Sequence, residues 1–283
     1  TLFPYTTLFR SDVVILAGGL LASFAAHMTL PDTRVIGWMH NNVTTYQTQY
    51  YAKMRTEFDA GLRALDGIVA LTETDLAGFS QYNHTTKIWN PLTIVPDGRA
   101  DLSQHTIALT SRIAIEHKGL DLALAFAAKL PHDWQLAIAG GGTDSDVSRF
   151  HSLVEQNHVA DKLIYRGALK DEALKKHYRA ASIFLQTSRW EGLPLVLAEA
   201  MSFGLPVVAM YNTGSAEVLE SGKYGLITPA TDVNALYDAI RPLLNNIQLR
   251  EEYAQRSLQR VEDFKIAPIL AQWEAILSPT FDN

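Results

Sequence analysis

Short apolar runs alternate along most of the chain with longer segments in which apolar residues recur every three or four positions. Three runs in the first third are typical of strands buried on both faces of a sheet: residues 13–17, 34–39 and 67–71. Six more follow, at residues 106–110, 135–139, 163–165, 183–186, 206–209 and 225–228. Helical spacing separates them, for example at residues 46–65, 74–82, 120–130 and 172–180. Strands that alternate with helices predict doubly wound parallel sheets with right-handed crossovers.

The chain divides into two unequal parts at a turn-rich segment, residues 90–98, which contains Asn-Pro and Pro-Asp-Gly. Residues 99–262 form a complete six-stranded domain, whereas residues 12–98 supply only about three strands. A helical tail follows at residues 263–283. We therefore predict an α/β protein with two doubly wound domains, the first of which is incomplete.

Residues 1–11 stand apart from this pattern. Their sequence, TLFPYTTLFRS, resembles a translated sequencing adapter, so we interpret the segment as adapter-derived rather than natural. The hypothesis explains the small first domain, because a coding region cut at this point would lack its first strands. Sequencing the source DNA across the junction tests it, and an intact upstream reading frame without adapter sequence would contradict it.

The composition is that of a globular protein and disfavours several classes of function. The chain has 283 residues, a net charge of −6 and no long Lys/Arg run, which disfavours nucleic acid as a main partner. The absence of cysteine excludes disulfides, thiolate nucleophiles and cysteine-bound zinc. The nine histidines show no metal-ligand spacing. The absence of cysteine fits a cytoplasmic protein. No apolar run reaches the length of a membrane span, and peripheral association with the inner face of the membrane stays open.

Two glutamates eight residues apart mark the most informative segment. Glu191 precedes Gly192, Leu193 and Pro194, and Glu199 lies in the apolar stretch that follows. Pro194 suits the first position of a helix, whose free N–H groups and positive dipole end favour a phosphate. A carboxylate among apolar residues is costly unless a partner satisfies it. The pattern favours a nucleotide-sugar site over the alternative, a buried helix with one satisfied and one exposed glutamate.

Ligands of open parallel sheets bind at the carboxyl ends of the strands, where further candidates fall. Ser111, Arg112 and Lys118 follow the strand at residues 106–110. The two cations can clamp a diphosphate, Arg112 as a planar fork and Lys118 as a point charge. The alternative interpretation is a pair of solvated loop cations.

Glycine-containing turns follow two further strands. Gly140 and Gly142 permit a tight turn, but the third glycine of a dinucleotide fingerprint is missing, which disfavours NAD. The acidic segment at residues 144–146 is interpreted as a helix cap rather than a metal site. Gly167 permits a flat base to lie against the backbone, although an ordinary turn explains it equally well.

His40 comes at the end of the strand predicted at residues 34–39. Histidine suits hydrogen bonding and proton transfer near neutral pH. A lone histidine is more often structural, so His40 is a candidate only together with the other motifs.

In combination, these motifs resemble the retaining glycosyltransferases of family 4, which have the GT-B architecture of two Rossmann-like domains. The resemblance rests on residues 111–119, the glycine turn at 140–142 and the two glutamates with seven residues between them. Residues 164–174 also look like the base-binding loop of the family. The resemblance covers residues 12–283, strongly after about residue 105 and more weakly before it.

The resemblance implies a role for each candidate. Arg112 and Lys118 would hold the donor diphosphate, Glu191 would contact hydroxyls of the donor sugar, and Glu199 would accept hydrogen bonds from the ribose. His40 would line the pocket for donor and acceptor. Further donor-binding positions would be Ser111, Gly140, Gly142, Gly167, Ala168, Leu169, Gly192, Leu193 and Pro194. The resemblance implies no metal and no cofactor, and a final helix that crosses back to the first domain.

The expected function is transfer of a hexosyl group from a nucleotide sugar, commonly a UDP-sugar in the family, to a glycan, lipid-linked or protein acceptor with retention of configuration. Cell-envelope or exopolysaccharide precursors are the leading acceptors. The alternatives are a nucleotide-sugar epimerase and a catalytically silent partner subunit of the same fold. The spacing of the glutamates favours transfer over epimerisation, and a silent subunit would be expected to lose the charged contacts that persist here.

Overall fold

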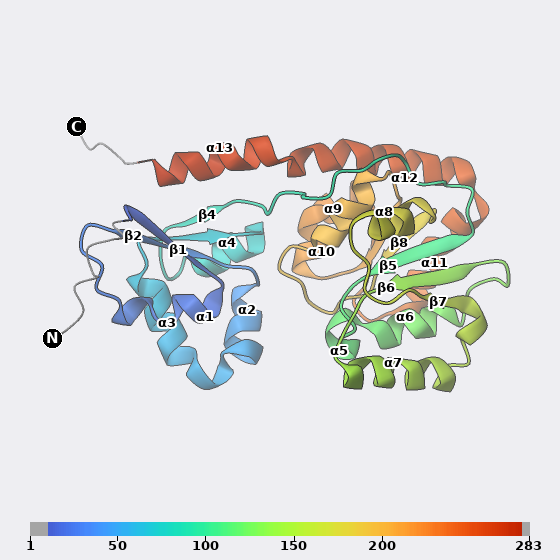
Figure 1. Ribbon diagram of the computed structural model, residues 1–283, viewed down its shortest axis with the longest axis horizontal. Helices are drawn as coiled ribbons and strands as arrows, with labels where there is room; N and C mark the ends of the chain where they lie inside the picture. Colours follow the sequence, from blue (N-terminus) through green and yellow to red (C-terminus); the bar gives the residue numbers. More distant parts are fainter. Residues whose placement is uncertain (1–10, 279–283) are drawn as a thin grey trace. The chain divides into compact units, whose positions relative to one another are not determined.

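The computed structural model describes residues 11–278, so that all but Ser11 of the segment interpreted as adapter-derived lies outside the described residues. The described chain forms two compact units, one made of residues 11–89 and 269–278 and the other of Asn90–Pro268. Each unit is a parallel sheet flanked by helices, which confirms the predicted α/β fold class (Figure 1).

The smaller unit is built on a four-stranded parallel sheet in the order β1-β2-β3-β4. Its strands are β1 (Val13–Ala17), β2 (Arg34–Trp38), β3 (Gly67–Ala70) and β4 (Thr85–Lys87). Its helices are α1 (Gly19–Ala22), α2 (Val43–Thr45), α3 (Arg55–Ala64), α4 (Glu73–Phe79) and most of α13 (Ile266–Leu277). Only three strands were predicted, because the Thr-Thr-Lys sequence of β4 contains no apolar residue.

Neighbouring residues of one strand face separate cores on the two sides of this sheet. Val35 of β2 packs in a cluster with residues of α1 and α3, whereas Ile36 packs in a cluster with residues of α13. On that second face, Trp273 of α13 meets Trp38 edge-on, with ring centroids 5.0 Å apart. The sheet of the smaller unit is thus covered on both sides, as parallel sheets usually are.

The single helix predicted for residues 46–65 is wrong. The segment begins with a π-helical turn at Tyr46–Tyr50 and becomes regular only in α3. Tyr46 is buried, its ring is stacked on that of Tyr51 at 5.2 Å, and its hydroxyl accepts a hydrogen bond from the N–H of His40. Packing of the aromatic rings therefore overrides the local helical pattern.

The larger unit is built on a six-stranded parallel sheet in the order β10-β9-β8-β5-β6-β7. Its strands are β5 (Thr106–Thr110), β6 (Gln135–Ala139), β7 (Leu163–Tyr165), β8 (Ile183–Gln186), β9 (Val207–Met210) and β10 (Leu226–Thr228). All six agree with the predicted strands to within one residue. Chain order reverses between β5 and β8, which makes this point the topological switch point of a doubly wound sheet.

Helices cover both faces of the larger sheet (Figure 1). On one face lie α6 (Leu120–Ala127), α7 (Asp144–Gln156) and α11 (Val233–Asn245), and on the other lie α8 (Asp171–Arg179), α9 (Leu195–Ser202) and α12 (Ile247–Arg260). Two short helices, α5 (Ile115–Lys118) and α10 (Thr213–Val218), follow the carboxyl ends of β5 and β9. The strands β8 and β9 between them are fully buried, which explains their continuous apolar sequences.

A titratable side chain, His177 of α8, is buried in the larger unit and is only 2% exposed. Burial, together with the nearby charge of Arg166, lowers the pKa of its imidazole to about 4. The folded protein therefore keeps this ring neutral at pH 5, whereas the same ring in the unfolded chain is mostly protonated at that pH.

We expect the free energy of unfolding to fall as the pH is lowered from 7 to 5. The contribution of His177 is fully present above pH 6.5 and is lost progressively toward pH 4, by about 2 kcal/mol at pH 5, because only the unfolded chain takes up the proton. Urea unfolding at both pH values measures the loss, which His177→Gln should remove. The same change at exposed His132 is the control. An equal loss in His177→Gln and the wild type would contradict the assignment.

Candidate active site

Two adjoining cavities lie at the carboxyl edge of the larger sheet, at the switch point between β5 and β8. One has a volume of about 240 Å³ and the other about 300 Å³. They share four lining residues, Thr110, Ser111, Arg112 and Val196. This is the edge at which open parallel sheets bind ligands, and we call the two cavities together the groove.

The smaller cavity gathers the residues predicted to contact the diphosphate and the sugar. Lys118 and Glu191 line it together with Leu193 and Pro194. Lys118 Nζ donates to Glu191 Oε1 at 2.7 Å, and each side chain is only 13% exposed. A charge-assisted bond between partly desolvated groups is stronger than an ion pair at the surface. The two predicted donor contacts therefore bind each other in this structure.

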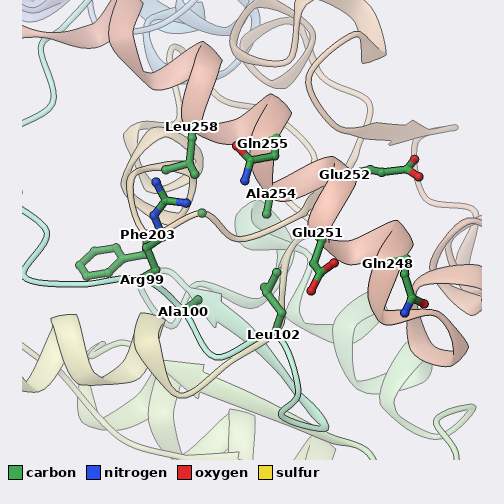
Figure 2. A pocket seen from close by; sticks show the side chains of 11 residues that line it. Arg99, Ala100, Leu102, Phe203, Gln248, Glu251, Glu252, Ala254, Gln255 and Leu258 are labelled. Carbon is green, nitrogen blue, oxygen red and sulfur yellow. The ribbon is translucent and has the colours of Figure 1, made fainter.

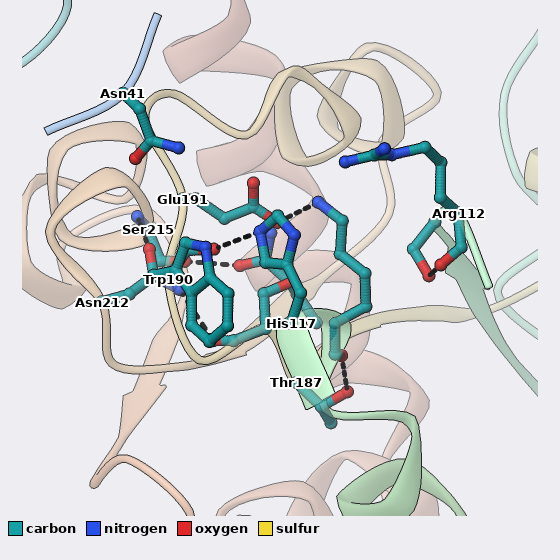
Figure 3. A network of polar contacts seen from close by, with 12 residues as sticks. Asn41, Arg112, His117, Thr187, Trp190, Glu191, Asn212 and Ser215 are labelled. Carbon is teal, nitrogen blue, oxygen red and sulfur yellow. Dashed lines mark hydrogen bonds and ion pairs between the residues drawn. The ribbon is translucent and has the colours of Figure 1, made fainter. Parts of the chain in front are cut away.

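The loop that carries Glu191 is fastened to the segment that follows β5. Arg189 binds Asp121 through two hydrogen bonds, of 2.9 and 2.7 Å. The His117 ring is stacked on that of Trp190, with centroids 4.5 Å apart and planes inclined by 4°, and its Nε2 lies 3.0 Å from the Trp190 carbonyl oxygen (Figure 3). These contacts hold Glu191 at the wall of the groove.

The start of α9 differs by one residue from the prediction. Pro194 was predicted as the first helical residue, but its ψ of 88° is not helical, so it is the N-cap and α9 begins at Leu195. Leu195 and Val196 line the smaller cavity, and their N–H groups have no partner within the helix because they belong to its first turn. The groove therefore receives the positive end of the α9 dipole.

Glu199 of α9 lines the larger cavity. Burial raises the pKa of its carboxyl group, while a hydrogen bond from the Tyr178 hydroxyl, at 2.6 Å, acts in the opposite direction. The two predicted glutamates therefore lie in different cavities of the same groove, Glu191 in the smaller and Glu199 in the larger.

The turn after β6 and the loop after β7 form another wall of the larger cavity. Gly140, Ala168 and Leu169 line it, as predicted positions of the donor site. The N–H of Gly140 donates to the Gly167 carbonyl at 2.7 Å, and its carbonyl accepts a hydrogen bond from the Tyr165 hydroxyl at 2.9 Å. The glycine turn is thus tied to the neighbouring loop.

Four predicted site residues do not line the groove. Gly142, Gly167 and Gly192 lie in its loops but not in its walls. His40 belongs to the smaller unit, where its ring leans on Trp38 with centroids 4.5 Å apart. The predicted role of His40 at the donor stays a prediction.

The acidic segment at residues 144–146 is part of a helix cap, as predicted. Thr143 is the N-cap of α7: its hydroxyl accepts the Asp146 N–H at 3.1 Å and donates to the Asp146 carboxylate at 2.7 Å. Among residues 11–278 there is no group of three or more histidine, aspartate or glutamate side chains that could hold a metal ion.

Four residues around the groove were not singled out from the sequence: His117, Tyr178, Trp190 and Asn212. Asn212 caps α10, and its side chain donates to the Ser188 carbonyl at 3.0 Å; its place directly before a helix was a usable signal. The other three make contacts between residues far apart in the sequence: His117 and Trp190 are separated by 73 positions, and Tyr178 and Glu199 by 21. No local sequence pattern reveals such contacts.

A larger hollow, of about 590 Å³, lies elsewhere on the same unit (Figure 2). Arg99, Phe203 and residues of α12 such as Glu251 and Gln255 line it. None of the predicted site residues lines it, so the volume of a cavity alone does not identify the candidate site of this unit.

A known protein family matches the sequence of the larger unit. Residues 98–260 match the family described as Glycosyl transferases group 1. The chain belongs to this family. The matched region contains all six strands of the larger sheet and every residue that lines the groove.

Relatives within this family include an uncharacterized glycosyltransferase of Haemophilus influenzae, 30% identical over 75% of the chain. A GDP-mannose-dependent mannosyltransferase of Mycolicibacterium smegmatis is 29% identical over 53% of the chain and 43% of its own length. The chain spans 61% of the length of the Haemophilus relative.

Solved glycosyltransferases have the same fold. HepE of Anabaena, in complex with UDP-glucose, superimposes with a TM-score of 0.80 at 18% identity, over 94% of this chain and 78% of that one. Sucrose-phosphate synthase of Thermosynechococcus elongatus gives a TM-score of 0.83 at 22% identity, over 94% and 72%. The architecture is therefore GT-B. None of the helices within residues 11–278 is long and apolar enough to cross a membrane.

Proposed function

We propose that the chain carries the donor site of a retaining hexosyltransferase of family 4, which uses a nucleotide sugar, commonly a UDP-sugar in that family. The observation that supports this most is the grouping of two cations, a helix start and two carboxylates along one groove: Arg112, Lys118, Leu195, Glu191 and Glu199. Cations and helix N–H groups suit a diphosphate, and carboxylates suit the hydroxyls of sugar and ribose.

Charge explains how such a groove would promote transfer. As the bond between the sugar C1 and the phosphate oxygen breaks, negative charge grows on the departing diphosphate, where Arg112, Lys118 and the start of α9 stabilise it. The acceptor oxygen bonds to C1 from the same face, and its proton passes to the departing phosphate oxygen. Glu191 is not assigned as a covalent nucleophile; its contacts with sugar hydroxyls would hold the ring in place.

The acceptor is proposed to be a glycan, a lipid-linked sugar or a protein, in a cytoplasmic enzyme that needs no metal. A role in the cell envelope is supported by relatives such as the lipopolysaccharide core mannosyltransferase LpsB of Rhizobium meliloti, 32% identical over 46% of the chain. Peripheral membrane association belongs to the same proposal, since lipid-linked acceptors lie at the membrane surface. A silent partner subunit remains the alternative that the binding test below addresses.

We expect UDP, or else GDP or ADP, to stabilise the full 283-residue chain in thermal unfolding, whereas NAD should not. A nucleotide at 100 times its dissociation constant stabilises by about 2.7 kcal/mol, which gives a clear rise of the midpoint. Incubation with the matching nucleotide sugar should then release the nucleoside diphosphate. A folded chain that responds to none of the three nucleotides would favour the silent subunit and remove the donor assignments.

A further inference from the structure

Tyr178 lies behind the groove, outside the residues that line it. It belongs to α8 and is fully buried, with its ring stacked on Phe203 at 5.3 Å and tilted against Phe184 at 5.9 Å. Its hydroxyl donates to Glu199 Oε2 at 2.6 Å. Two aromatic neighbours thus fix the orientation of the Tyr178 ring, and the fixed hydroxyl in turn orients the carboxylate of Glu199.

Glu199 uses its two carboxylate oxygens differently. Oε2 accepts the hydrogen bond from Tyr178, while Oε1 makes no hydrogen bond with any residue in the described range 11–278. Glu199 lines the larger cavity, together with Ala168 and Leu169. One oxygen is therefore anchored to the protein, and the other is left to accept a hydrogen bond from a ligand in the cavity.

We propose that Tyr178 is a positioning residue that sets the preference of this site for a ribonucleotide over a deoxyribonucleotide. The inference rests on the proposed function, because it takes the ligand of Glu199 to be the ribose of the donor. A glutamate that is free to rotate can turn away when a hydroxyl is missing, at little cost. A glutamate held by Tyr178 keeps its oxygen in place, so a missing hydroxyl leaves a desolvated carboxylate oxygen unpaired.

The test compares nucleotides that differ by one hydroxyl. The nucleoside diphosphate that binds best among UDP, GDP and ADP is titrated against the full chain by calorimetry, together with its 2′-deoxy and 3′-deoxy analogues. The wild type should bind the ribonucleotide roughly 10- to 100-fold more tightly than at least one analogue, because hydrogen bonds to charged groups are the strong ones.

In Tyr178→Phe, which retains the ring and its packing, we expect this ratio to fall most of the way toward one. The affinity for the deoxy analogue should rise, because a carboxylate released from Tyr178 can turn away when the hydroxyl is missing. Glu199→Gln in the Tyr178→Phe background should change the ratio little further, because two residues that act as one unit are not additive.

Tyr165→Phe is the matched control. It also removes a tyrosine hydroxyl that bonds to a residue of the larger cavity, the Gly140 carbonyl at 2.9 Å, and this hydroxyl is not bonded to Glu199. It should weaken ribonucleotide and deoxyribonucleotide by the same factor and leave the ratio unchanged.

The outcomes separate the two proposals. If the wild type binds a nucleoside diphosphate without discriminating its deoxy analogues, or if Tyr178→Phe retains the wild-type ratio, the inference is overturned and the donor site stands. If no nucleoside diphosphate binds, both fall together. Should Tyr178→Phe fail to fold, Tyr178→Met, which also lacks the hydroxyl, carries the same expectation.

Discussion

Replacing Gly140 with alanine is expected to abolish nucleotide binding and to destabilise the larger unit by ~3 kcal/mol or more, at the upper end of the cost of overpacking. A Cβ at this position would lie only 1.6 Å from the carbonyl oxygen of Ser111. That oxygen belongs to the backbone of the loop that also carries Arg112, and it cannot rotate away as a side chain can. The loops after β5 and β6 would have to separate at the groove, so both folding and ligand contacts suffer.

Gly141 provides a neighbouring control. A Cβ there would meet the Cβ of Ala168 at 3.1 Å, a contact that a shift of a few tenths of an ångström relieves. Denaturant unfolding should therefore show a loss of less than ~1 kcal/mol for Gly141→Ala. Equal stability of the two variants would show that the close approach at Gly140 does not hold the loops together.

The larger sheet could be predicted from the sequence because its four central strands, β5, β6, β8 and β9, are mostly buried. Continuous apolar runs such as β8 and β9 leave little ambiguity once they alternate with helices. The smaller unit was harder to predict for two physical reasons. The strand β4 has no apolar residue, and the turn at Tyr46–Tyr50 is fixed by aromatic packing rather than by helix propensity.

The candidate site could be predicted from the sequence only in part. Arg112, Lys118 and Glu191 could be grouped because each follows a strand that ends at the same edge of the sheet. Tyr178 could not, because it sits in the helix before β8 and reaches Glu199 only through the packing of two helices. Residues that contact a ligand can be predicted in this fold, because they follow the carboxyl ends of the strands. Residues that position those ligand-contacting side chains can be identified only from the tertiary structure.

Arg112 and Lys118 differ in a way that the sequence did not indicate. Lys118 is paired with Glu191 and is mostly buried, whereas the side chain of Arg112 is exposed and makes no hydrogen bond or ion pair with residues 11–278. Arg112 is also shared by both cavities. A diphosphate that spans the groove can thus take the guanidinium of Arg112 at no cost to the protein, but it must compete with Glu191 for the ammonium of Lys118.

We therefore expect Arg112→Met to lower nucleoside diphosphate affinity and sugar transfer by roughly 100-fold without changing the unfolding midpoint, since two charge-assisted hydrogen bonds of about 1.5 kcal/mol each are lost. Lys118→Met should weaken binding too, and it should also destabilise the fold by about 1–3 kcal/mol, because Glu191 is left without its partner. Calorimetric titration and thermal unfolding of each variant separate the two effects.

Two further variants sharpen this contrast. Lys118→Met combined with Glu191→Gln should regain most of the lost stability, because no unpaired carboxylate remains, yet it should not regain binding. Lys129→Met, on the surface of the same unit, should match the wild type in both measurements. If Arg112→Met binds the nucleotide as tightly as the wild type, the diphosphate does not contact the part of the groove that both cavities share. The assignment of the groove as the diphosphate site would then be wrong.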